Sequence, residues 1–91
     1  MKRAVKVFIK GSVQSLFFRQ FVKENADKIG VKGHVRSLED GRVEAFIEGD
    51  PEKVQAMIDV CKKGPQHALI RGVEEKEERF QDFKEFKIIR F

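Results

Sequence analysis

The sequence predicts an α+β domain in which two helices cover one face of a mostly antiparallel sheet. Three observations predict this arrangement. Short segments alternate between apolar and polar residues, which is typical of half-buried strands, and two longer segments carry apolar residues at helical spacing. The segments follow one another in the order strand, helix, strand, strand, helix, strand. An Asp-Gly pair between the two middle strands is a strong hairpin signal.

One strand and one helix are expected in the first third of the chain. Val5, Val7 and Ile9 alternate with the side chains between them, which predicts a strand over residues 5–10. A helix is expected to begin around Phe18 and to end before Gly30, a typical C-terminal cap. Its apolar stripe consists of Phe18, Phe21, Val22, Ala26 and Ile29.

A hairpin and a second helix are expected next. Strands over residues 31–37 and 42–48 flank a turn at about residues 38–41. Asp50 stands before Pro51 and is expected to cap the second helix, which ends at a Gly-Pro pair, residues 64–65. Its apolar stripe consists of Val54, Met57, Ile58 and Cys61.

The last third of the chain is less regular. Residues 69–73 suggest a strand, residues 74–78 are a charged stretch, and residues 84–91 alternate weakly as a last strand. The order β-α-β-β-α-β, with room for an extra terminal strand, contains two right-handed βαβ halves. It predicts a ferredoxin-like α/β sandwich with both helices on one face of the sheet. Residues 1–91 are expected to form a single domain.

Cysteine use and hydropathy indicate an intracellular protein. Cys61 is the only cysteine, so no intrachain disulfide can form and a reducing compartment is expected. The N-terminus has no signal-peptide pattern, and no apolar run approaches the roughly 18 residues of a membrane span. We expect a cytoplasmic monomer with no membrane association. No His and Cys residues have metal-ligand spacing, so no metal is expected.

The net charge of +4 has two interpretations. It attracts anions such as nucleic acid or a phosphorylated metabolite, or it reflects Lys and Arg residues spread among carboxylates over a solvated surface. No run of basic residues stands out in the chain, which favours the second interpretation.

The segment before the first helix has the features of an anion site. Residues 11–19 read Gly-Ser-Val-Gln-Ser-Leu-Phe-Phe-Arg and lead from a strand into a helix start. A helix start carries backbone N–H groups without intrahelical partners and a partial positive charge. Arg19 adds a planar set of donors that matches phosphate or carboxylate oxygens. This combination predicts a phosphate cradle, although an isolated helical Arg more often pairs with an acid such as Glu24.

Residues 11–19, followed by Phe21, Val22, Ala26, Ile29 and Gly30, resemble the signature of the acylphosphatases. The resemblance continues through residues 33–36, 40–44 and 48–49. It implies an enzyme that hydrolyses the carboxyl–phosphate bond of small acyl phosphates without metal or cofactor. It also implies that Arg19 holds the phosphoryl group, or a phosphate anion. The backbone amides that would assist are those of Ser15, Leu16, Phe17, Phe18 and Arg19 itself.

The sequence departs from the family at two positions of the implied site. Ser15 stands where the family commonly has Gly, which takes positive φ without strain. Ser37 stands where the family has an Asn that holds the attacking water, and a hydroxyl is shorter than a carboxamide and lacks its paired donor and acceptor groups. Weak or impaired catalysis is therefore expected. The bulk of residues 16–18 also predicts a narrower mouth for the cradle.

Two alternatives remain at this point. One is an inactive relative that binds a phosphorylated ligand or a protein partner. The other is an RNA-recognition domain, which shares the element order but carries a basic residue, a Gly and base-stacking aromatics in its third strand. Residues 42–48 offer only Phe46 between acidic residues, so nucleic acid is not an expected partner. His34, where the family often has Trp, is expected to be a half-exposed packing residue rather than a general base.

Overall fold

The computed structural model describes residues 1–13 and 16–90. Within these residues the chain forms five strands and two helices. They follow in the order β1 (Arg3–Gly11), α1 (Leu16–Ile29), β2 (Lys32–Ser37), β3 (Val43–Gly49), α2 (Pro51–Lys63), β4 (Ile70–Glu78) and β5 (Phe86–Ile88). Neither helix is long and apolar enough to cross a membrane, as far as the described residues extend.

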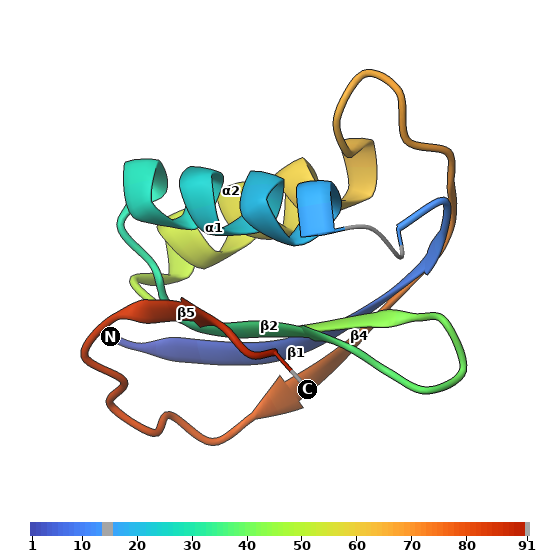
Figure 1. Cartoon of the computed structure of the whole chain (residues 1–91). Coiled ribbons are helices and arrows are strands. Elements are labelled where there is room, and N and C mark those ends of the chain that lie inside the picture. Colours follow the sequence, from blue (N-terminus) through green and yellow to red (C-terminus); the bar gives the residue numbers. More distant parts are fainter. Residues whose placement is uncertain (14–15, 91) are drawn as a thin grey trace.

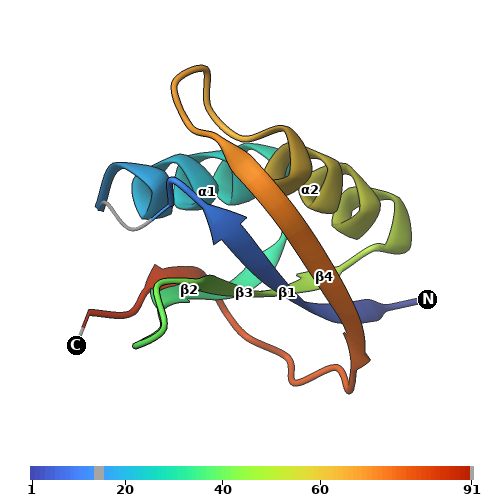
Figure 2. The same cartoon turned by 90° about the vertical axis from the view of Figure 1, so that its right-hand side faces the viewer.

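The strands form one sheet in the order β4-β1-β3-β2-β5, and both helices lie on the same face of it (Figures 1 and 2). This arrangement confirms the ferredoxin-like sandwich. β1 is antiparallel to β3 and β4, and β2 is antiparallel to β3, but β5 runs parallel to β2. The sheet is therefore mixed, whereas the sequence predicts a mostly antiparallel one.

The core lies between the sheet and the two helices. Alternation along β1 turns Val5, Val7 and Ile9 toward the helices, and all three side chains are fully buried. The predicted stripes meet them: Phe18, Val22 and Ala26 of α1 are buried, as are the four predicted stripe residues of α2. Phe21 and Ile29 are only partly buried at the edge of this core. Apolar burial on this face fixes α1 over β2 and β5 and fixes α2 over the other strands.

The two ends of α2 differ in how well the sequence predicts them. Gly64 caps the C-terminus, where its N–H donates to the carbonyl of Val60 at 2.8 Å. Asp50 occupies the N-terminal cap position, but its side chain makes no capping hydrogen bond. The predicted cap position is therefore confirmed, but Asp50 contributes its carbonyl, which accepts from the N–H of Val54 at 2.9 Å, rather than its side chain. Pro51, which has no N–H to satisfy, begins the helix there.

The C-terminal third differs most from the sequence prediction. The charged stretch at residues 74–78 belongs to β4, which runs to Glu78 along the edge of the sheet. Charged side chains suit an edge strand because they discourage pairing with another chain. Residues 79–85 then pass below the sheet on the face opposite the helices (Figure 1), and β5 is limited to Phe86–Ile88. Because the chain crosses this face before returning, β5 enters parallel to β2.

Candidate functional site

The start of α1 is positioned by the irregular end of β1. The pairing of β1 with β4 shifts register between Lys10 and Gly11. Gly11 has a φ of +137°, and a Cβ there would lie 1.9 Å from the carbonyl oxygen of Leu69, so only Gly fits. The next residue, Ser12, donates its N–H to that same carbonyl at 2.8 Å. The chain thereby leaves the sheet at a defined point just before the helix begins.

Arg19 and Ser37 meet at one end of the sandwich. Arg19 lies in the first turn of α1, and Ser37 is the last residue of β2. The Nη1 atom of Arg19 donates a hydrogen bond to the Oγ atom of Ser37. α1 packs directly over β2 and β5, so the first turn of the helix reaches the end of the strand. The structure therefore brings together the two side chains that the sequence places at the implied site.

A surface depression of about 280 Å³ surrounds this contact. Its lining consists of Leu16, Arg19, Ser37, Ile89 and Arg90. Among the described residues the lining includes two arginines and one serine but no Asp or Glu. Such a surface attracts an anion and offers it planar donors from Arg.

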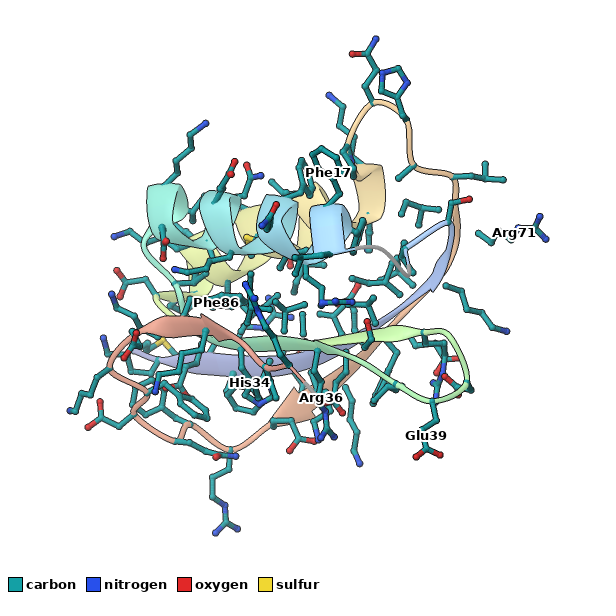
Figure 3. The ribbon with its side chains drawn as sticks, viewed as in Figure 1. Phe17, His34, Arg36, Glu39, Arg71 and Phe86 are labelled. Carbon is teal, nitrogen blue, oxygen red and sulfur yellow. The ribbon has the colours of Figure 1, made fainter. Side chains whose placement is uncertain are left out.

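The other predicted site residues occupy different surroundings. Leu16 and Phe17 carry the first backbone N–H groups of α1. The Phe17 side chain is 82% exposed and lines a separate, largely apolar pocket of about 490 Å³ beside Phe21 and Pro65; it projects from the helix in Figure 3. Phe18 turns its side chain into the core. Only Leu16 among residues 16–18 lines the depression, so the narrower mouth predicted from their bulk rests on Leu16 alone. Ser15 lies outside the described residues.

Arg90 is a residue of this depression that sequence reasoning missed. It follows β5, whose pairing with β2 sets Val35 beside Ile88, and the N–H of Ile89 donates to the carbonyl of Val35 at 2.9 Å. These bonds bring the end of the chain next to Ser37. No local pattern in residues 84–91 reveals the parallel partner of the strand, so the sequence carried no signal for the place of Arg90.

Two acidic residues of the turn after Ser37 point away from the depression or are already paired. Glu39 extends from the turn between β2 and β3 into solvent (Figure 3). The Asp40 carboxylate accepts hydrogen bonds from the backbone N–H of Arg42 at 3.1 Å and from its Nε atom at 2.8 Å. These bonds hold the pKa of Asp40 below its ordinary value. Neither carboxylate lines the depression.

His34 lies on the opposite face of the sheet. Its ring stacks on Phe46 at 5.7 Å between centroids and meets the edge of Phe83 at 5.6 Å; Figure 3 shows it below the sheet, away from α1. Burial lowers the pKa of His34, and the nearby Glu44 carboxylate opposes that shift. The predicted packing role is confirmed, and the sheet separates His34 from the depression. No three His, Cys, Asp or Glu residues cluster as metal ligands in the described parts of the chain.

Comparison with known proteins places this geometry in a family. A family model described as acylphosphatase matches residues 5–88. The chain belongs to the acylphosphatase family. An acylphosphatase from Rubrobacter xylanophilus is 46% identical over 76 residues, covering 84% of this chain and 69% of the relative. One from Syntrophus aciditrophicus is 41% identical over 90 residues, covering 98% of this chain and 94% of the relative.

The solved structures agree with the sequence relatives. The crystal structure of acylphosphatase from Bacillus subtilis is similar with a TM-score of 0.90 and 30% identity, covering 99% of this chain and 100% of that one. These comparisons identify the protein as acylphosphatase-like. The substrates of acylphosphatases are small acyl phosphates.

Proposed function

We propose that this protein hydrolyses the carboxyl–phosphate bond of acyl phosphates slowly, at the depression where Arg19 meets Ser37. The observation that carries the proposal is the hydrogen bond between these two side chains, one from the first turn of α1 and one from the end of β2. This contact supports a site where a guanidinium suited to phosphate and a hydroxyl lie together, in a depression whose described lining includes no Asp or Glu.

In this mechanism a water molecule attacks the phosphorus atom opposite the acyl oxygen. The bond between phosphorus and the acyl oxygen breaks, and its electron pair leaves with the carboxylate. The proton of the water passes to the phosphoryl oxygens, so the products are a carboxylate and dihydrogen phosphate. Arg19 and the N–H groups of Leu16 and Phe17 stabilise the phosphoryl oxygens. Because the carboxylate is a good leaving group, positioning and charge stabilisation supply most of the catalysis.

Ser37 limits the rate in this proposal. Its hydroxyl engages Arg19, and it cannot present a donor and an acceptor to water at the reach of an Asn carboxamide. Loss of one positioned polar group lowers kcat by roughly 10²–10³-fold in comparable sites. Ser15 adds to the deficit if the loop needs the positive φ that Gly tolerates, at a cost on the order of 1–3 kcal/mol.

The proposal is tested by phosphate release from benzoyl phosphate with the purified protein. We expect slow hydrolysis, competitive inhibition by inorganic phosphate, and loss of activity in Arg19→Ala. Arg79→Ala serves as the control, because Arg79 is exposed and follows the end of β4, beside the start of β1 and far from Gly11. Activity that survives Arg19→Ala would refute the assignment of the site.

The replacement of Asn by Ser37 favours a second candidate, a relative that binds a phosphorylated ligand or a protein without catalysis. Titration with phosphate, followed through backbone amide shifts, separates the two. Shifts at Leu16, Phe17 and Arg19 together with no hydrolysis by the wild type or Ser37→Asn would favour the binding protein. Shifts that cluster elsewhere would contradict both.

The remaining parts of the proposal are a single domain over residues 1–91, a monomer, a cytoplasmic location and no nucleic-acid partner. The opposite face of the sheet supports the last of these. Phe46 is 2% exposed beneath His34 and Phe83, and its neighbours Glu44 and Glu48 are also buried. A buried ring between carboxylates offers no stacking platform for bases.

A further inference from the structure

Phe17 is the most exposed phenylalanine that the structure describes. Its side chain lines the largely apolar pocket of about 490 Å³ beside α1, which we call the Phe17 pocket. That volume lies within the usual range of small-molecule sites. Because an aromatic ring in water is stabilised when an apolar group covers it, the Phe17 pocket is suited to an apolar ligand.

The walls of the Phe17 pocket come from α1 and from the loop after α2. Phe17, Phe21 and Glu24 follow one another at helical spacing on one side of α1. Pro65 and Ala68 line the pocket from the loop, which rises beside the start of α1 in Figure 1. The apolar surface of the pocket comes from its phenylalanines, Pro65 and Ala68, and Glu24 is the one acidic residue of the described lining.

The Phe17 pocket begins one residue away from the depression that contains Arg19 and Ser37. Leu16 lines the depression, and Phe17 lines the pocket. The Cα atoms of two neighbouring residues are only about 3.8 Å apart. Under the proposed function, the N–H groups of Leu16 and Phe17 stabilise the same phosphoryl oxygens, so the phosphoryl group would lie between the depression and the pocket.

The proposed reaction gives the acyl part of the substrate a direction. The attacking water and the departing acyl oxygen lie on opposite sides of the phosphorus atom. Ser37, the proposed neighbour of the water, contacts Arg19. Arg19 follows Phe17 by two residues, which at 3.6 residues per turn separates their side chains by about 200° around the helix. An acyl part that leaves on the side opposite Ser37 therefore extends toward the Phe17 pocket.

We infer that the Phe17 pocket binds the acyl part of the substrate and that Phe17 is a specificity-determining residue. The preferred substrates are then acyl phosphates whose acyl part is apolar and aromatic, since rings pack favourably against Phe17 and Phe21. A second anionic group on the acyl part is disfavoured, because Glu24 repels it. This inference rests on the proposed function for the reaction, but binding in the pocket does not depend on catalysis.

A pair of matched substrates tests the inference. 4-Phenylbutyryl phosphate and butyryl phosphate differ only by a terminal phenyl group, which is too far from the carbonyl to alter the leaving group. We expect wild-type kcat/KM to be about tenfold higher for the first. Phe17→Ala and Ala68→Asp, which change opposite walls, should both remove most of this preference. Leu69→Ala is the control, because Leu69 is 56% exposed but does not line the pocket.

The ratio of the two kcat/KM values decides the outcome, because any effect of a variant on the phosphoryl group cancels in it. Equal wild-type values for the two substrates would overturn the inference. A preference that survives in both Phe17→Ala and Ala68→Asp would also overturn it, because the phenyl group would then bind elsewhere.

A binding measurement on the wild type separates this inference from the proposed function and needs no variant. 5-Phenylpentylphosphonate and pentylphosphonate form a matched pair that cannot be hydrolysed. We expect tighter binding of the first, with nuclear Overhauser effects from its phenyl protons to the Phe21 ring and the Ala68 methyl group. If these contacts appear but neither acyl phosphate is hydrolysed, the proposed reaction fails and the ligand pocket stands. Hydrolysis without these contacts overturns the pocket and leaves the reaction.

Discussion

Ser37 stands at the end of β2, where its hydroxyl accepts from Arg19, and its identity is expected to set the rate. Ser37→Asn should raise kcat/KM for benzoyl phosphate on the order of 10-fold or more, because the longer carboxamide holds water while leaving Arg19 to the phosphoryl group. Adding Ser15→Gly should help further, although two changes in one site need not add. Steady-state kinetics tests this. An unchanged rate in Ser37→Asn, with activity still dependent on Arg19, would mean that another group holds the water.

His34 is expected to make stability depend on pH. Burial lowers its pKa below the ordinary value of 6.5, so the unfolded chain takes up this proton at a higher pH than the folded protein. The contribution of neutral, buried His34 to the free energy of unfolding is therefore complete above about pH 6.5 and is lost as the pH falls below that value. Urea unfolding from pH 7.5 to 5 should show falling stability in the wild type and a flatter curve in His34→Phe. His67→Gln, in an exposed loop, is the control; the wild-type slope persisting in His34→Phe would contradict the assignment.

The segment from residue 79 to residue 85 is held beneath the sheet by one buried carboxylate. Glu48 is 1% exposed, and it accepts from the N–H groups of Gln81 at 2.7 Å and Phe83 at 2.5 Å. Glu48→Gln replaces one acceptor with a donor that faces a backbone N–H. We expect a loss of about 1–3 kcal/mol in unfolding free energy and faster amide exchange at Gln81 and Phe83. The exposed Glu74→Gln is the matched control, and equal stability of the two variants would disprove the anchoring role.

The elements show which parts of the structure a sequence can predict. β1, the hairpin and both helices follow from local periodicity and caps, so their positions agree with prediction to within a few residues. β4 extends five residues beyond its predicted end because an edge strand needs no apolar alternation. The parallel pairing of β5 depends on the path of residues 79–85, which only tertiary contacts determine. For that reason the sequence predicts Arg19 and Ser37 at one place, where the structure shows them in contact, but gives no indication of Arg90 beside them.

The whole molecule is expected to unfold as one unit. Strands from both ends of the sequence are interleaved, since β1 lies between β3 and β4 while β5 lies beside β2. α1 and α2 also pack against each other. Calorimetry should give a van't Hoff enthalpy equal to the calorimetric enthalpy, with one transition that coincides with the loss of far-ultraviolet dichroism. Two separate transitions would contradict a single domain over residues 1–91.

The proposed site lies at one end of the sandwich, where a helix begins and strands from two distant parts of the chain finish. The central hypothesis is that Arg19 and Ser37 act on the same phosphoryl group. The most direct test compares benzoyl phosphate hydrolysis by the wild type, Ser37→Asn, Arg19→Ala and the double variant. We predict that Ser37→Asn raises kcat/KM only where Arg19 is present, so the double variant is as inactive as Arg19→Ala. An equal gain from Ser37→Asn in both backgrounds would contradict a shared site.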